Sequence, residues 1–106
     1  MSERFMRVFV FFDLPTLTSA DKKEYRRFRK FIIEQGFMMM QQSVYCKMAL
    51  NGSIVRSTIN QVRKNKPAEG LVQTLVVTER QYANMEYIIG ESHSTLLADD
   101  QRLVIL

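Results

Sequence analysis

The chain has 106 residues, of which 46% are hydrophobic and 25% are charged, so it is long and apolar enough for one packed domain. This composition excludes a wholly disordered chain, and no segment reaches the roughly 18 apolar residues that a membrane-spanning helix needs. The net charge of +4 weakly favours a polyanionic partner, and the single Cys46 excludes an internal disulfide and a redox ferredoxin. With no signal peptide visible, a cytoplasmic protein is expected.

The first predicted strand covers residues 5–12, where Phe and Val dominate and burial on both faces is expected. Pro15 ends this strand. The spacing of Thr18 and Asp21 predicts a helix N-cap. The helix should run from about Ser19 to Gln35, followed by Gly36 as a left-handed stop.

The later elements follow from apolar patterns separated by turn residues. We expect two strands with a turn at Gln41–Gln42, then a helix that starts near Asn51 and is closed by Pro67 and Gly70. Cys46, in the second of these strands, is expected to be a core thiol. The expected strands after the first are 37–40, 43–50, 71–78, 85–89 and 103–106. A short polar turn or helix at 79–84 connects the third and fourth of these, and a loop at 90–100 connects the last two.

This order of elements predicts an α+β fold of the ferredoxin-like β-α-β-β-α-β kind, with extra C-terminal strands and two helices on one face of an antiparallel sheet. We expect one domain over residues 1–106, with its core at about 5–90. The uncovered sheet face favours a homodimer, because a core this small gains from shared apolar surface. The C-terminal strand is expected to pair with a partner's edge through Leu103, Val104, Ile105 and Leu106.

The first helix carries an unusual group of cations. Its apolar residues fall in an arc of about 120°, and a basic arc of about 160° lies opposite. Glu24 is expected at the apolar boundary, so this face has almost no balancing acid, and phosphates would offset the repulsion. The alternative is an ordinary solvated surface. The basic arc holds Lys22, Lys23, Arg26, Arg27, Arg29 and Lys30, and further candidate nucleic-acid-binding residues are Arg63, Lys64 and Arg80.

The sequence contains no base-reading motif, such as zinc-finger spacing, an aromatic RNA-binding strand or a GXXG loop. Contacts to the nucleic-acid backbone would therefore dominate, with little sequence preference.

Asp13 ends the first apolar strand, where a strand delivers its last side chain to the sheet surface. A carboxylate there either binds a metal ion or caps the turn at Leu14–Thr16, and taken alone the position favours the cap. Mg²⁺ usually takes one or two carboxylates plus water and phosphate, and no acidic motif near Asp13 completes that set. A catalytic Asp13 would therefore need a second Asp13 from a two-fold partner.

Five segments spread over most of the chain carry recognisable motifs: Phe12–Thr16, Tyr25–Phe31, Glu34–Phe37, Gln42–Tyr45 and Val77–Met85. The first two are fairly specific in combination. Together they resemble the motifs of the small CRISPR-associated adaptation protein, the ferredoxin-like partner of the Cas integrase. The tract through Tyr45 is most similar to its type II version.

The resemblance implies a homodimer that bridges two Cas integrase dimers and holds a double-stranded DNA prespacer during CRISPR spacer acquisition. It also implies a Mg²⁺-dependent endonuclease, because family members are described as endoribonucleases and some act on double-stranded DNA. The family's metal-binding, catalytic aspartate maps to Asp13, and RNA becomes a further candidate partner. Two hypotheses follow: an adaptation scaffold, and an endonuclease with a site shared by the dimer. Outside the family, the third hypothesis is a stand-alone toxin-like ribonuclease or a small regulatory ferredoxin-like protein.

Overall fold

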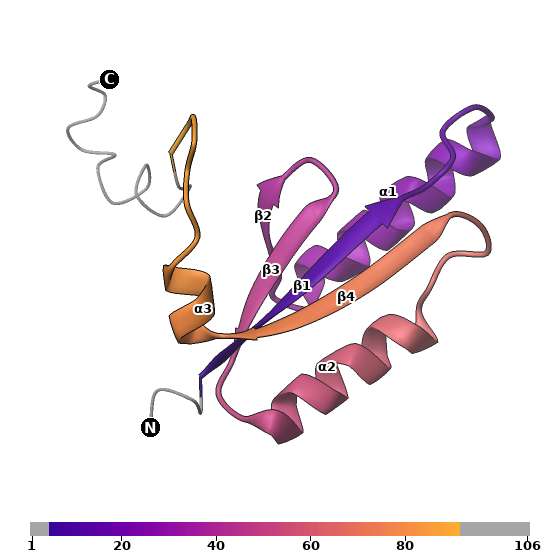
Figure 1. The fold of residues 1–106 in the computed structure, drawn as a ribbon. Coiled ribbons are helices and arrows are strands. Elements are labelled where there is room, and N and C mark those ends of the chain that lie inside the picture. Colours follow the sequence, from indigo (N-terminus) through magenta and orange to yellow (C-terminus); the bar gives the residue numbers. More distant parts are fainter. Residues whose placement is uncertain (1–4, 92–106) are drawn as a thin grey trace.

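The computed structural model describes residues 5–91, which form four strands and three helices. The sheet order is β2-β3-β1-β4, and every neighbouring pair is antiparallel. The predicted α+β class, the β-α-β-β-α-β order and the antiparallel sheet are thus confirmed (Figure 1). In chain order the elements are β1 (Met6–Asp13), α1 (Ser19–Glu34), β2 (Met38–Gln41), β3 (Val44–Ala49), α2 (Gly52–Lys64), β4 (Leu71–Thr78) and α3 (Glu79–Ala83).

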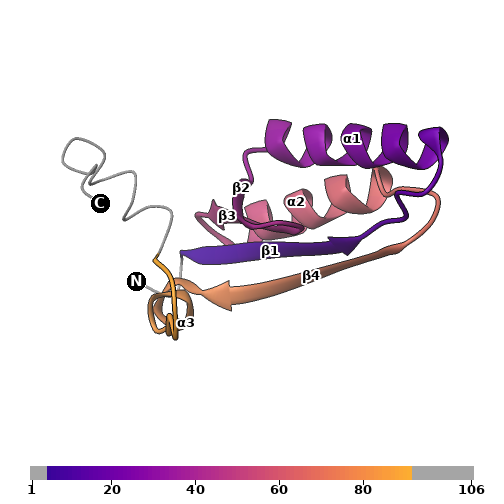
Figure 2. The same ribbon diagram turned by 90° about the horizontal axis from the view of Figure 1, so that it is seen from above.

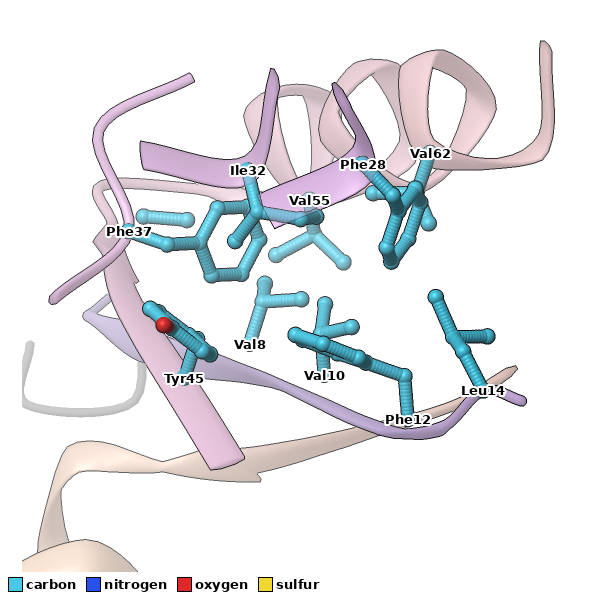
Figure 3. Close-up of a cluster of buried hydrophobic side chains, with 11 residues drawn as sticks. Val8, Val10, Phe12, Leu14, Phe28, Ile32, Phe37, Tyr45, Val55 and Val62 are labelled. Atoms are coloured by element: carbon cyan, nitrogen blue, oxygen red, sulfur yellow. The ribbon is translucent and has the colours of Figure 1, made fainter. Parts of the chain in front are cut away.

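Helices α1 and α2 lie side by side over one face of the sheet, as the two ribbon views show (Figures 1 and 2). The side chains of β1 alternate, so every second residue points into the layer between sheet and helices. Figure 3 shows the buried cluster that fills this layer. It includes Val8, Val10 and Phe12 from β1, Tyr45 from β3, Phe28 and Ile32 from α1, and Val55 and Val62 from α2.

Strand β1 is the central strand, and it pairs with β3 on one side and β4 on the other. On the face opposite the helices, Phe9 is 6% exposed because its ring packs on Tyr82 of α3, with centroids 6.0 Å apart. Phe11, two residues on, is only half-buried. This sheet face is therefore covered near α3 and open beyond it.

Helix α1 begins and ends where its sequence predicts. Thr18 forms a capping box with Asp21: its hydroxyl accepts from the Asp21 N–H at 3.0 Å, and the Asp21 carboxylate accepts from the Thr18 N–H at 3.1 Å. Gln35 is the C-cap, and Gly36 follows with φ of +98°. A glycine takes this conformation without the steric cost that a side chain adds.

The expected strand at residues 85–89 is wrong. The structure places no strand there, and Ile88 and Ile89 are 88% and 91% exposed. A strand needs a backbone partner, and no described strand pairs with this segment. The other expected extra strand, Leu103–Leu106, lies outside the described residues. Among the described residues, no helix is long and apolar enough to cross a membrane.

Candidate functional site

Asp13 is the last residue of β1, lies opposite Leu71 of β4, and has an exposed side chain. Among residues 5–91, no hydrogen bond joins its carboxylate to the N–H groups of the turn at Leu14–Thr16. The next N–H groups, those of Leu17 and Thr18, donate to the Asp21 carboxylate, at 3.2 and 3.1 Å. Within residues 5–91, the Asp13 carboxylate therefore stays available to a ligand, and the turn-cap interpretation gains no support.

One chain does not complete a magnesium site around Asp13. No group of three or more His, Cys, Asp or Glu side chains that could hold a metal ion exists in the described part of the chain. Asp21 and Glu24 line a hollow of about 280 Å³ beside Leu14. Asp21 is engaged in the helix cap and Glu24 in an ion pair. Within residues 5–91, Asp13 therefore has no cluster of carboxylates around it, and Mg²⁺ there would need water, phosphate or a further carboxylate to complete its coordination.

The basic face of α1 is partly neutralised, which the sequence interpretation missed. The Glu24 carboxylate accepts two hydrogen bonds from Arg27, from Nη2 at 2.8 Å and from Nε at 3.0 Å. These bonds lower the pKa of Glu24 and raise that of Arg27. Arg27 Nη2 also donates to the Asn65 carbonyl at 3.1 Å. The prediction that this face lacks a balancing acid is wrong at Arg27.

The other cations of α1 are exposed. In the described part of the chain the salt bridges are Arg7–Glu79 and Arg27–Glu24, so no ion pair engages the remaining five. Arg29 donates from Nε to the Tyr45 hydroxyl oxygen at 3.0 Å, a neutral partner that leaves its charge in place. These five cations, which we call the α1 cations, are Lys22, Lys23, Arg26, Arg29 and Lys30.

The more distant candidate cations divide between the two sides of the sheet. Arg63 and Lys64 are in the last turn of α2, on the same side as α1, and Arg63 Nη1 also bonds the Asn60 side chain. Arg80 is on α3, which lies on the other side, as Figure 2 shows. The structure therefore does not bring Arg80 together with the α1 cations.

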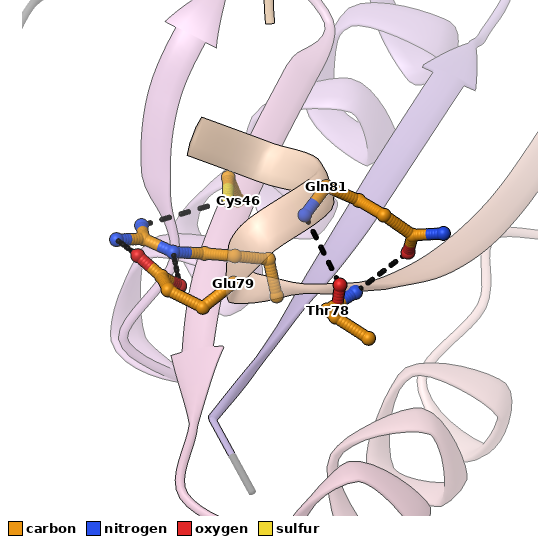
Figure 4. Close-up of polar contacts among 5 residues, drawn as sticks. Cys46, Thr78, Glu79 and Gln81 are labelled. Carbon is orange, nitrogen blue, oxygen red and sulfur yellow. Dashed lines mark hydrogen bonds and ion pairs between the residues drawn. The ribbon is translucent and has the colours of Figure 1, made fainter. Parts of the chain in front are cut away.

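A polar cluster that sequence reasoning missed joins the start of β1 to α3. Arg7 donates from Nε and Nη2 to the two oxygens of Glu79, at 2.9 and 3.1 Å. Its Cζ lies 4.1 Å from the centroid of the Tyr82 ring, and its Nη1 is 3.9 Å from Cys46 Sγ. Figure 4 shows the bonds to Glu79 and Cys46 beside the capping box of α3, in which Thr78 and Gln81 exchange hydrogen bonds.

The cluster has electrostatic consequences for two of its members. The Glu79 carboxylate raises the pKa of Arg7, and burial raises the pKa of the Cys46 thiol. Cys46 is 4% exposed, which confirms it as a core thiol. A signal for the cluster was present, because Arg7 is a lone cation inside an apolar strand.

The sheet face opposite the helices is largely apolar and hollowed. One hollow of about 400 Å³ is lined by Phe9, Phe11, Leu75 and Met85 among others. A second, of about 520 Å³, is lined by methionines of β2 and β3 together with Arg7 and Tyr82. Leu75 is 51% exposed in the middle of this face. We call this surface the open sheet face.

Comparison with known proteins identifies the family. The model of the family "CRISPR associated protein Cas2" matches residues 6–85. The chain belongs to the Cas2 family. The resemblance seen in the sequence motifs is thereby confirmed, and the matched residues run from the start of β1 through α3.

Two curated Cas2 relatives are similar over nearly the whole chain, and both are named CRISPR-associated endoribonuclease Cas2. The one from Treponema denticola is 54% identical over 101 residues, which are 95% of this chain and 100% of that protein. The one from Streptococcus mutans UA159 is 44% identical over 95% of this chain and 93% of that protein. A solved structure titled "Crystal structure of cas2" has a TM-score of 0.57 at 14% identity, covering 85% of this chain and 92% of that one, and shows the same fold.

Proposed function

We propose that this Cas2-family chain acts in CRISPR adaptation as a homodimeric scaffold that binds duplex prespacer DNA and bridges integrase dimers. The observation that carries the proposal is the exposed group of α1 cations, for which the described part of the chain provides no acidic partner. Such a group gains free energy by neutralising phosphates and releasing their counterions.

The surface is suited to the shape and charge of a nucleic acid more than to its sequence. Lysine and arginine side chains on one helix contact backbone phosphates, which carry no base identity. The described structure offers no helix end or loop with the motif of a base-reading module. A scaffold that holds prespacers of any sequence needs binding without sequence preference.

The homodimer is supported by the open sheet face. Leu75 is half-exposed there and Phe11 only half-buried, next to a hollow of about 400 Å³. An apolar surface of this kind on a small domain marks an interaction site. A second copy covering it in an isologous interface would repeat every group about a two-fold axis, including Asp13.

The experiment that tests the scaffold is reconstituted spacer integration with the partner integrase, comparing wild type with Asp13→Ala. The variant must first be shown to remain dimeric and to bind duplex DNA. Integration that persists supports a scaffold whose chemistry, if any, belongs to another process. Integration that fails with binding and dimer intact assigns a chemical role to Asp13. A wild-type protein that neither binds duplex DNA nor supports integration contradicts the proposal.

A second candidate function is a Mg²⁺-dependent endonuclease acting on RNA or double-stranded DNA. It is supported by the names of the two relatives and by the exposed, uncapped carboxylate of Asp13. Since residues 5–91 of one chain provide no cluster of three metal-binding side chains, Asp13 of each subunit would hold the metal across the dimer axis. A bound Mg²⁺ would polarise the phosphate and help activate a water.

The endonuclease is tested by Asp13→Asn, which keeps the shape of the side chain and removes its charge. Cleavage of RNA and of duplex DNA should require Mg²⁺ in the wild type and disappear in this variant. Glu69→Gln is a suitable control, because Glu69 is an exposed acid near the same end of the sheet. Cleavage that survives Asp13→Asn would place the activity at another site or in a contaminant.

A further inference from the structure

The two arginines on the flanks of α1 differ in what they contact. Arg27 faces the C-terminal end of α2, and its guanidinium is held by the Asn65 carbonyl there and by the Glu24 carboxylate of α1 itself. Arg29 faces β3, where its Nε donates to the Tyr45 hydroxyl oxygen at 3.0 Å. The flank toward α2 is therefore neutralised within the protein, and the flank toward β3 keeps its charge.

Helical spacing places two more cations on the same flank as Arg29. Lys22, Arg26 and Arg29 follow one another at intervals of four and three residues, so their side chains form a row. The row is about 10 Å long at the rise of an α-helix. Lys22 and Arg26 are exposed, and no acid among residues 5–91 forms an ion pair with either. We call this row the Arg29 flank.

Tyr45 gives Arg29 a fixed point of attachment. Tyr45 is 1% exposed, and its ring stacks on Phe12 with centroids 5.5 Å apart, so the core fixes its hydroxyl. The hydroxyl is neutral and engages only Nε, which leaves the two Nη groups of Arg29 for a bidentate contact. A side chain that is already oriented loses less conformational entropy when it binds.

We propose that Arg29 is an oriented phosphate-binding group, that Tyr45 is its positioning residue, and that the nucleic-acid backbone follows the Arg29 flank of α1. The inference rests on the proposed function, because it assumes that the α1 cations bind a nucleic acid. It goes further by assigning the contact to one flank and by excluding Arg27. It also gives a positioning role to a buried core tyrosine.

The first test measures the affinity of the full chain for a duplex of arbitrary sequence, by fluorescence anisotropy over a salt series. Arg29→Gln should lower the affinity and reduce the slope of log affinity against log salt by about 1. The matched control is the double variant Glu24→Gln/Arg27→Gln, which removes the ion pair without changing the net charge. It should leave both the affinity and the slope at their wild-type values.

The second test separates positioning from structure. Tyr45→Phe keeps the ring and the net charge, so the salt slope should stay constant and the affinity should fall roughly three- to tenfold. In an Arg29→Gln background the same change should have no further effect. Arg29→Lys changes an exposed residue and therefore leaves the packing of the core unchanged, unlike a substitution of Tyr45. It should retain the slope, lose the bidentate contact, and become insensitive to Tyr45→Phe.

Three results would overturn the inference. They are wild-type affinity and slope in Arg29→Gln, an equal loss from Tyr45→Phe in both backgrounds, and a loss in the Glu24/Arg27 double variant as large as in Arg29→Gln. Wild-type protein without salt-dependent duplex binding is a different outcome, since it rejects the proposed function itself and the inference with it.

Discussion

Gly70 lies so close to Asp13 that a Cβ atom at position 70 would be 2.7 Å from the Asp13 carbonyl oxygen. Gly70 also has φ of +103°, in the region that favours glycine. The loop that leads into β4 is thereby held against the end of β1, at the residue that presents the candidate carboxylate. Position 70 thus helps to fix the backbone from which the Asp13 side chain extends.

Gly70→Ala should destabilise the protein by about 2 kcal/mol or more, because it adds both backbone strain and a clash with backbone. The measurement is chemical denaturation followed by circular dichroism. Gly90→Ala is the matched control, since Gly90 has φ of +94° but no atom of the described residues within 4 Å of the added Cβ. It should cost less, about 1 kcal/mol, because it adds backbone strain without a clash. Equal costs at the two positions would show that the close approach contributes nothing.

The Arg7–Glu79 pair should contribute more to stability than the Glu24–Arg27 pair. Its side chains are 22% and 33% exposed, against 42% and 38% for Arg27 and Glu24, so solvent screens it less. A double-mutant cycle with Arg7→Met and Glu79→Gln should give a coupling of about 1 kcal/mol. The same cycle with Arg27→Met and Glu24→Gln should give a smaller coupling. A reversed order would mean that burial does not decide the strength of these pairs.

Cys46 should resist alkylation in the native state, because burial raises the pKa of its thiol and covers the sulfur. Iodoacetamide at about pH 8.5, where a free thiol ionises, should react much faster in denaturant than under native conditions. A native rate equal to the denatured rate would contradict a buried thiol.

The same pKa shift predicts the direction of a pH effect on stability. The folded state holds the Cys46 proton more tightly than the unfolded state does. Stability from this group is therefore complete below the thiol's ordinary pKa and is lost as pH rises through the raised value. Cys46→Ala should remove this part of the alkaline loss, measured as the free energy of unfolding between neutral and alkaline pH.

Leu75→Glu should convert the proposed homodimer to monomer, because it buries a carboxylate in the middle of an apolar interface. Light scattering coupled to gel filtration measures the mass directly. Leu17→Glu is the control: Leu17 is 89% exposed and precedes α1, away from the open sheet face. A dimer that survives Leu75→Glu would show that the subunits associate through another surface.

Local signals in the sequence predicted much of the fold. Thr18 and Gly36 mark the ends of α1 because caps depend on neighbouring residues alone. The segment 85–89 was predicted wrongly as a strand because its apolar side chains say nothing about whether a backbone partner is present. Strand pairing depends on the assembled sheet, so the residue pattern of one segment does not predict it.

The candidate site was predicted less completely, and for a similar reason. A helical wheel places Arg27 and Arg29 in one basic arc, but it does not contain the Asn65 carbonyl or the Tyr45 hydroxyl that distinguish them. The bond between Arg7 and Glu79 joins residues 72 positions apart, which no spacing rule detects. Asp13 was identified because a charged residue directly after an apolar strand is a local signal.

The central place of β1 affects how the protein is made. β1 leaves the ribosome first, yet its two neighbours are β3 and β4, and β4 ends only at Thr78. At a synthesis rate of about 5–20 residues per second, several seconds pass between the synthesis of the Phe-rich β1 and that of its last partner, β4. Pairing between distant segments also makes folding slow. During that interval the nascent chain leaves its Phe-rich strand unpaired, a state in which exposed apolar surface and open strand edges favour aggregation.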